Sequence, residues 1–294
     1  MNPAKSSIAR ATLMIVLSAL SFGSISVLTT LVTNAGTSLV TAMAWRYVIG
    51  TLLLAAIARV GNLREVPRKQ IVQLLLIGGL GQALITYVSL RALDFIPVGP
   101  LAFLFYTYPA WVAGLAAIRR TERLTPVRVV ALVVALTGVA TMIGAPAAER
   151  LNPIGVTLAL ASAVMYAFYL PALEHVQKDV PALLSTFLLV VGAAITFILA
   201  AMTGGEIVIN MRADVWTNIM LLAIVSTVIA FGSLIKGLAV LGPVRTSIIA
   251  TVEPFFTAVL GVVVLRNQFT TGTWIGGILI AAAIIMIEWS SAQA

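Results

Sequence analysis

The chain alternates long apolar segments with short polar connections. Ten segments are apolar over about 20 residues, the length that an α-helix needs to cross the roughly 30 Å hydrocarbon core of a bilayer. They fall at about 11–32, 38–58, 71–92, 98–118, 127–145, 153–173, 181–202, 215–238, 244–265 and 272–289. They are too long and too uniformly apolar for barrel strands, which alternate over about ten residues. The pattern therefore predicts an all-α membrane protein with ten transmembrane helices.

Composition agrees with this prediction and narrows the chemistry. Of the 294 residues, 61% are hydrophobic and 10% are charged, against about 25% charged in an ordinary soluble domain. The chain has no cysteine and one histidine, which leaves little material for a metal site or a catalytic triad. We therefore expect no cofactor, no metal, no nucleic-acid partner and no enzymatic activity. The expected partners are the lipid bilayer and a small-molecule substrate.

The excess of basic residues gives the expected orientation. The chain carries 18 Lys and Arg against 10 Asp and Glu. If the N-terminus is cytoplasmic, most of the basic residues fall in cytoplasmic loops or at cytoplasmic helix ends, as the positive-inside rule requires. An even number of spans returns the chain to the side on which it began. Both termini are therefore predicted to be cytoplasmic.

An internal repeat divides the expected helices into two sets of five. Placing Pro109 on Pro254, 145 residues later, aligns basic helix ends and the threonines that follow them without a gap. The two repeats are residues 1–147 and 148–294. Because five is odd, the second repeat enters from the opposite side of the membrane. Such inverted repeats surround a central cavity in secondary transporters, with the substrate site near the midplane. An old duplication retained only for packing is the alternative.

The duplicated blocks resemble those of a known transporter family. The first reads PVGPLAFLFYTYPAWVAGLAAIRRTERLTPVRVVALVVALTGVATMI and the second LGPVRTSIIATVEPFFTAVLGVVVLRNQFTTGTWIGGILIAAAIIMI. A mid-helix proline, a short charged turn, a threonine and a Gly-rich last helix are similar to the EamA-type branch of the drug/metabolite transporter superfamily. The resemblance covers essentially the whole chain. Asn267 stands where the second copy would repeat Glu122, so whatever that glutamate does is not duplicated.

Within the superfamily, the chain looks most like bacterial aromatic amino acid exporters of the YddG type. This resemblance implies export of aromatic and other neutral amino acids across a bacterial inner membrane. Members of that group also confer resistance to some toxic organic cations. The resemblance therefore leaves a multidrug or quaternary-ammonium exporter as an alternative on the same fold.

Polar stripes inside the spans indicate where a substrate cavity lies. A polar side chain in a span faces the protein interior or a water-filled cavity, because contact with lipid is costly for it. The candidate cavity residues are Gln82, Thr86, Tyr87, Tyr108, Ser162, Tyr166, Tyr169, Ser233 and Glu253. This mixture suits an amphipathic substrate; the alternative is that the hydroxyls bond to carbonyls of the preceding turn. Spans 2, 5, 7 and 10 have weaker stripes and are expected outside, as scaffold.

Two ionisable residues lie deep in the expected spans. Glu253 is about nine residues from either end of span 9, or roughly 13 Å from an interface at 1.5 Å per residue. An acid at that depth binds a proton, an ion or a cationic group, or it accepts structural hydrogen bonds. Arg46 lies within span 2, and we interpret it as structural, paired with a carboxylate or with backbone carbonyls.

Prolines and glycines add expectations about helix shape and packing. Pro109 and Pro254 each remove a backbone hydrogen bond and are expected to kink their helices, either as gating elements or as static kinks. Gly272 and Gly276 permit close helix packing, either within the fold or in a dimer. We therefore expect a monomer or a weak homodimer.

Together these patterns predict a secondary transporter that exports amino acids, with aromatic and other bulky neutral ones preferred. Transport would proceed by alternating access of the two repeats around the central cavity. The driving force, a substrate gradient or proton exchange, stays open. A reading from another class is an intramembrane enzyme, for which no clustered catalytic set is visible, or a scaffold without a cavity.

Overall fold

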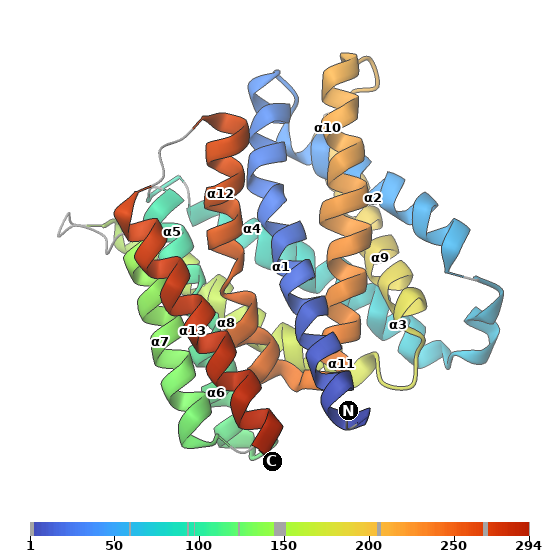
Figure 1. The fold of residues 1–294 in the computed structure, drawn as a ribbon. Coiled ribbons are helices and arrows are strands. Elements are labelled where there is room, and N and C mark those ends of the chain that lie inside the picture. The colour runs from blue at the N-terminus through green and yellow to red at the C-terminus, as the bar shows by residue number, and fades with distance from the viewer. Residues whose placement is uncertain are drawn as a thin grey trace.

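The structure is a computed structural model that describes residues 3–58, 60–92, 94–96, 98–122, 124–143, 151–204, 207–266 and 270–293. All regular structure in these ranges is helical (Figure 1). The first half contains α1 (Pro3–Asn34), α2 (Leu39–Ile57), the 3₁₀ turn η1 (Val60–Glu65), α3 (Arg68–Leu76), the π-helix η2 (Ile77–Gly81), α4 (Gln82–Ala92), α5 (Val98–Phe105), α6 (Tyr108–Arg119) and α7 (Pro126–Ile143). The second half contains α8 (Pro153–Val176), α9 (Ala182–Gly204), α10 (Ala213–Ala223), the π-helix η3 (Ile224–Ile229), α11 (Ala230–Ala250), α12 (Glu253–Leu265) and α13 (Thr271–Gln293).

Apolar helices occupy every position at which a span is expected. Among the described residues, seven helical stretches are long and apolar enough to cross a membrane. Three shorter apolar helices cover the other expected spans: Pro126–Met142, Glu253–Leu265 and Thr271–Ile287. The all-helical membrane architecture is thus confirmed, whereas the count of ten crossings stays a prediction.

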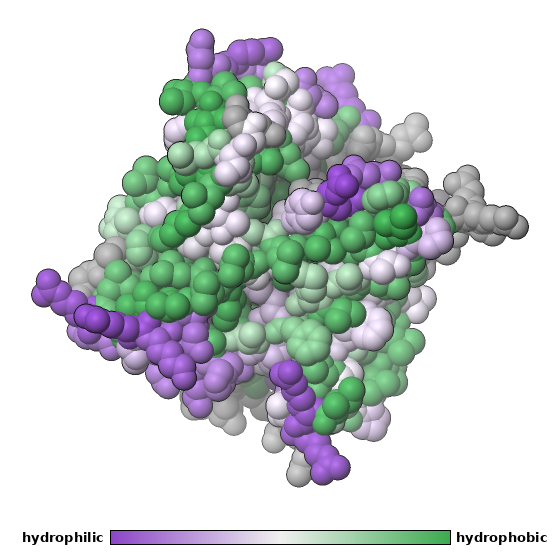
Figure 2. Space-filling view, turned by 180° about the vertical axis from the view of Figure 1, so that it is seen from behind, coloured by the Kyte–Doolittle hydropathy of each residue, from purple (hydrophilic) through white to green (hydrophobic). Residues whose placement is uncertain are grey.

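The surface has the distribution expected of a protein in a bilayer. Figure 2 shows apolar side chains over the middle of one face and hydrophilic side chains gathered mainly at its ends. The beginning of α1 and the end of α13 lie at the same end of the bundle (Figure 1). This arrangement agrees with termini on one side of the membrane; which side they occupy stays a prediction.

Local sequence accounts for several helix ends. Ser38 precedes α2, and its hydroxyl accepts a hydrogen bond from the Thr41 N–H at 3.2 Å. Asn152 caps α8 in the same way, through the Ile154 N–H at 2.9 Å. Each cap satisfies one of the amide groups that a helix leaves unpaired at its start. Gly36, with φ of 91°, makes the turn between α1 and α2 in a conformation that favours glycine.

Corresponding helices of the two halves have matching partners. The first helix of the first half, α1, packs against α11 and α12, while the first helix of the second half, α8, packs against α4 and α6. The second helices α2 and α9 pair with each other, as do the last helices α7 and α13. Two halves related by a two-fold axis would exchange partners in this way. The residue at which the halves divide stays a prediction.

Each half also contains a π-helical segment that the sequence pattern does not reveal. η2 interrupts the span from α3 to α4, and η3 interrupts the span from α10 to α11. A π-turn inserts one extra residue into an α-helix, so it rotates the side chains that follow relative to a regular helix. The helical spacing assumed for spans 3 and 8 therefore does not continue through these segments.

Each of the two prolines follows a local break in its span, and a role of these breaks in gating stays a prediction. Pro109 lies in the first turn of α6 and Pro254 in the first turn of α12. In each case a tight turn of two residues separates the new helix from the one before it. Proline is tolerated in a first turn because its missing N–H would have no intrahelical partner there. The prolines therefore begin half-helices near the middle of the bundle.

Glycines bring backbones into contact within the fold. A Cβ at Gly276 of α13 would overlap the carbonyl oxygen of Gly138 in α7. A Cβ at Gly272 would lie 2.6 Å from the carbonyl oxygen of Thr141. The glycine pair in α13 thus packs against α7, which settles its use in favour of intramolecular packing. In α9, Gly192 lies in the same close relation to the Leu75 carbonyl of α3.

Glu122 joins the two halves at the end of the bundle where the termini lie. Its carboxylate accepts a hydrogen bond from the Val244 N–H at 3.3 Å and pairs with Arg128 at 3.1 Å. Val244 follows Gly242, whose φ of 74° breaks α11 there. Burial raises the pKa of the Glu122 carboxyl, and the Val244 N–H and Arg128 partly offset this effect. Glu122 therefore caps a helix segment of the other repeat.

The close packing at Gly192 gives a stability prediction. In Gly192→Ala, the new methyl group would overlap the Leu75 carbonyl, and overpacking of this kind costs about 1–3 kcal/mol. We expect the purified protein to unfold at a lower temperature than the wild type. Gly114→Ala is the matched control, since nothing lies within 4 Å of a Cβ there, and it should be neutral or stabilising. Equal melting temperatures for the two variants would contradict this packing.

The orientation can be tested directly because the chain has no cysteine. Asn34 and Lys178 are exposed, at the end of α1 and in the turn after α8. If the termini are cytoplasmic, a membrane-impermeant thiol reagent should label Asn34→Cys in intact cells and Lys178→Cys only after permeabilisation. The wild-type chain is the blank control. The reverse labelling pattern would place the termini outside.

Candidate functional site

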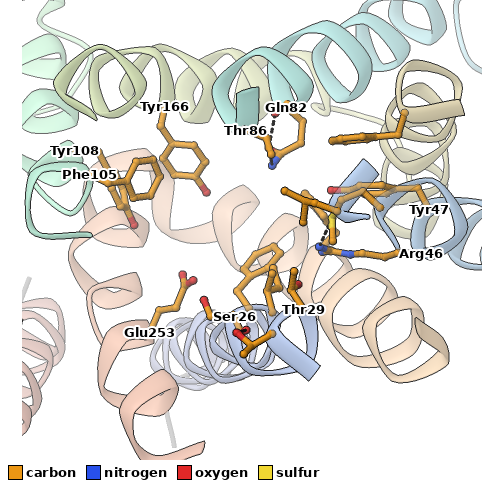
Figure 3. A pocket seen from close by; sticks show the side chains of 17 residues that line it. Ser26, Thr29, Arg46, Tyr47, Gln82, Thr86, Phe105, Tyr108, Tyr166 and Glu253 are labelled. Carbon is orange, nitrogen blue, oxygen red and sulfur yellow. Dashed lines mark hydrogen bonds between the residues drawn. The ribbon is translucent and has the colours of Figure 1, made fainter. Parts of the chain in front are cut away.

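A cavity of about 390 Å³ lies between the two halves of the molecule (Figure 3). Its lining comes from α1, α2, α4, α5, α6, α8, α9, α11 and α12. The α1 residues come from the second part of that helix, beginning with Phe22, and the α2 residues from its first part, ending with Tyr47. The cavity therefore extends from the middle of the bundle toward the α1–α2 turn, away from the termini.

The opposite end of the bundle is closed by apolar side chains. Ile15 of α1, Leu173 of α8 and Leu238 of α11 are all completely buried. A Cβ at Gly237 of α11 would overlap Ile15, so these helices are in close contact. The site is thus accessible from one side of the bundle and sealed on the other.

One wall of the cavity is a cluster of aromatic rings. The Tyr108 and Tyr166 ring centroids are 4.8 Å apart in an edge-to-face arrangement. Phe105 lies 5.6 Å from each of these rings. Tyr169 lies behind Tyr166 and stacks on it at 5.5 Å. Such contacts fix the rings, so that their faces and edges form a rigid surface for an aromatic or cationic group.

Two further aromatic pairs border the cavity on other sides. Tyr47 of α2 stacks on Phe197 of α9 at 5.4 Å, and Phe22 of α1 meets Phe231 of α11 edge to face at 5.0 Å. All four residues line the cavity. Each pair joins one helix from each half of the chain. A change in the relative position of the halves would therefore change the shape of the cavity.

Polar groups interrupt the apolar lining at a few places. Gln82 and Thr86 lie one turn apart in α4, directly after the π-turn η2, and Figure 3 shows both facing the cavity. The side-chain amide of Gln82 donates a hydrogen bond to the Thr86 hydroxyl at 3.5 Å. That hydroxyl in turn donates to the backbone carbonyl of Gln82 at 2.8 Å. A substrate can compete for the amide because this hydrogen bond is long.

Glu253 supplies a carboxylate in the cavity. It is the first residue of α12, immediately after the break that precedes Pro254. The Thr257 hydroxyl donates to the Glu253 carbonyl at 3.1 Å and to the Gly23 carbonyl at 3.2 Å, which fixes this turn against α1. Tyr106 lies within hydrogen-bonding reach of the carboxyl group. None of the ion pairs among the described residues includes Glu253.

Arg46 supplies a cation in the same cavity. Its side chain is only 3% exposed. Nε donates to the Thr227 hydroxyl at 2.7 Å, and one terminal nitrogen donates to the Ser226 carbonyl at 2.6 Å. The guanidinium carbon lies 4.9 Å from the centroid of the Tyr47 ring. Figure 3 shows Arg46 and Glu253 on opposite sides of the cavity.

The structure brings five of the nine candidate residues into the cavity lining, namely Gln82, Thr86, Tyr108, Tyr166 and Glu253. Tyr169 supports this lining from behind. Their roles in binding stay predictions.

The other three candidates lie elsewhere. Tyr87 is 63% exposed on the outer face of α4, because it follows Thr86 and successive helical residues point about 100° apart. Ser162 is fully buried, and its hydroxyl donates to the Ala159 carbonyl at 2.7 Å, as in the alternative considered for hydroxyl residues. Ser233 is buried in α11 and is not part of the cavity lining.

Spans 2 and 7 are not the outer scaffold that their weak polar stripes predict. α2 contributes Met43, Arg46 and Tyr47 to the cavity, and α9 contributes Phe197. The polar stripes of these two helices are weak because most of their cavity residues are aromatic or apolar. Arg46 was the one signal in the sequence, and its position in the middle of a span could have directed attention to α2.

The arrangement is suited to binding a small solute. Within the described residues, no group of three or more His, Asp or Glu side chains could hold a metal ion. The cavity instead combines rigid aromatic walls with one carboxylate and one guanidinium. That combination can hold a small amphipathic solute.

Comparisons with known proteins agree with this geometry. The model of the EamA-like transporter family matches the chain twice, over residues 9–144 and 153–289. The uncharacterized inner membrane transporter YicL of Salmonella typhimurium is 31% identical over 70 residues, which are 24% of this chain and 23% of that protein. The chain thus aligns with about a quarter of the length of that relative.

A solved crystal structure of a protein has the same fold. It superposes with a TM-score of 0.77 at 20% identity and covers 97% of this chain and 98% of its own. The two family matches together account for nearly the whole chain. The chain therefore belongs to the EamA-like transporter family, as a multi-pass membrane transporter.

Proposed function

We propose that this transporter exports amino acids, with aromatic and other bulky neutral ones preferred, across a bacterial inner membrane. The observation that carries the proposal is the cavity between the two halves, in which the Glu253 carboxylate, which takes part in no ion pair among the described residues, faces a wall of fixed aromatic rings. An amino acid would place its ammonium group against this carboxylate and its side chain against the rings. The resemblance to aromatic amino acid exporters supports the direction of transport.

The dimensions of the cavity support a small solute. About 390 Å³ lies within the range of small-molecule sites. The ring pairs on three sides give an aromatic side chain partners for edge-to-face or offset stacking, each worth about 0.5–1.5 kcal/mol. Neutral aliphatic side chains would gain burial alone. An order of preference with aromatic amino acids first follows from this lining.

Alternating access supplies the mechanism in this proposal. The cavity extends toward the α1–α2 turn and is sealed at the other end, which corresponds to an outward-accessible state if the termini are cytoplasmic. In the opposite state, the contacts among α1, α8 and α11 at the sealed end would separate. The helices around the α1–α2 turn would then close over the cavity. The exchanged packing of the two halves gives both states similar sets of contacts.

A quaternary-ammonium or multidrug cation exporter is the second candidate. The feature that favours it is Glu253 beside the aromatic rings, because cations bind both to carboxylates and to aromatic faces. The two candidate functions differ in the solute: an amino acid carries a carboxylate group besides its ammonium group, whereas a quaternary ammonium ion carries only the positive charge.

Transport in proteoliposomes tests the cargo. Vesicles loaded with labelled phenylalanine, alanine or tetraethylammonium should release phenylalanine fastest and the organic cation no faster than protein-free vesicles do. Faster release of phenylalanine than alanine is expected from the aromatic lining. Release of the cation alone would reject the amino acid proposal in favour of the second candidate.

Substitution of Glu253 tests the ammonium site. Glu253→Gln keeps the shape of the side chain and removes its charge. A hydrogen bond to a charged group contributes about 1.5–3 kcal/mol, so the KM for phenylalanine should rise about tenfold or more. If the cargo is instead a quaternary ammonium ion, its transport should be abolished. Glu65→Gln, at an exposed acid away from the cavity, is the control; an unchanged KM in Glu253→Gln would exclude the ammonium role.

A further inference from the structure

Arg46 is a buried cation with no counter-ion among the residues that the structure describes. Its side chain is 3% exposed, and no ion pair among the described residues includes it. The groups that accept its hydrogen bonds are a hydroxyl, a carbonyl and a thioether, all of them neutral. A buried charge without an opposite charge is costly, and within a membrane such residues mark substrate or ion sites. The cavity beside Arg46 is therefore a place where an anionic group would be stabilised.

The hydrogen bonds of Arg46 use one edge of the guanidinium and leave the other nearly free. Nε and Nη2 share an edge, and this edge donates to the Thr227 hydroxyl and the Ser226 carbonyl. The other edge consists of Nη1 and the second N–H of Nη2. Among the described residues, the one hydrogen-bond partner of this edge is the Met43 sulfur, 3.6 Å from Nη1, and a thioether is a weak acceptor. A guanidinium edge with two N–H groups matches a carboxylate.

The π-helix η3 determines which edge is free. Ser226 and Thr227 both belong to η3 and are completely buried. The Thr227 hydroxyl also donates to the Leu222 carbonyl at 3.1 Å, five residues earlier. On the other side, a Cβ at Gly50 would meet the Thr227 methyl group at 3.1 Å, so α2 lies close against η3. The guanidinium is thus held rigidly before any solute binds.

We propose that Arg46 binds the carboxylate group of the transported solute through its Nη1 and Nη2 edge, and so selects carboxylate-bearing solutes over simple cations. This inference rests on the proposed function and names the second charge that the site recognises. Arg46 and Glu253 lie on opposite sides of one cavity (Figure 3). A zwitterion has a favourable group for each, whereas an amine without a carboxylate meets an uncompensated positive charge at Arg46.

Ligand binding by the purified protein separates the two charges of the solute. The probes are phenylalanine, 3-phenylpropionate, which lacks the amine, and phenethylamine, which lacks the carboxylate. In Arg46→Gln, affinity for phenylalanine and 3-phenylpropionate should fall at least about tenfold, while phenethylamine should bind as well as before or better. Arg64→Gln, at an exposed arginine, is the control. Wild-type affinity of Arg46→Gln for 3-phenylpropionate would overturn the proposal.

A second variant leaves Arg46 in place in case its removal prevents folding. Met43→Glu puts a carboxylate beside Nη1, where it should occupy the free edge. We expect the same loss of 3-phenylpropionate binding, with phenethylamine binding retained. Met43→Gln has the same shape without the charge, and it should bind 3-phenylpropionate at least about tenfold more tightly than Met43→Glu does. If Met43→Glu binds 3-phenylpropionate like Met43→Gln, the free edge is not the carboxylate site.

The outcome also separates this inference from the proposed function. Binding of 3-phenylpropionate that depends on Arg46, together with no transport of any amino acid, would reject amino acid export and leave the carboxylate site standing. Transport of phenylalanine by Arg46→Gln with the wild-type KM would leave amino acid export standing and reject the role of Arg46.

Discussion

The requirement that polar groups in a bilayer find partners inside the protein governs this structure. Lipid offers no hydrogen bonds, so irregular backbone and charged side chains are stable only where other parts of the chain surround them. Arg46 and Glu253 line the cavity between the two halves, and the buried residues Ser226 and Thr227 of the π-helix η3 hold Arg46 there. The charged side chains of the spans are therefore gathered by the same constraint that keeps the outer surface apolar.

The site depends on contacts between the halves more than on any one helix. Arg46 of α2 is oriented by η3, the turn at Glu253 is fixed against α1, and the Tyr47–Phe197 and Phe22–Phe231 pairs each join the two halves. Movement of one half against the other would change all of these contacts together. In the proposed mechanism, these shared residues would couple binding to conformational change, which alternating access requires.

The two halves are similar in packing but not in charge. The charges of Arg46 and Glu253 lie on opposite walls of the cavity (Figure 3), and each belongs to one half of the chain. Glu122 links the halves at one end of the bundle, whereas the second copy has Asn267 at the corresponding place in the sequence. A strictly symmetric cavity would present the same group on both walls. In the proposed mode of binding, this chemical difference would let the cavity distinguish the carboxylate group of a solute from its ammonium group.

The sequence by itself determined the helical membrane architecture, the position of the apolar helices and five residues of the cavity, because hydrophobic length and polar stripes follow from local spacing along one helix. It misplaced Tyr87, Ser162 and Ser233 and left α2 and α9 outside. The outward direction of Tyr87 follows from the 100° step between neighbouring helical residues. Only the tertiary structure decided the other points, since the exposure of a side chain depends on which neighbour covers it and on π-turns that rotate a helix. The free edge of Arg46 has the same origin, because it is set by residues 180 positions away in η3.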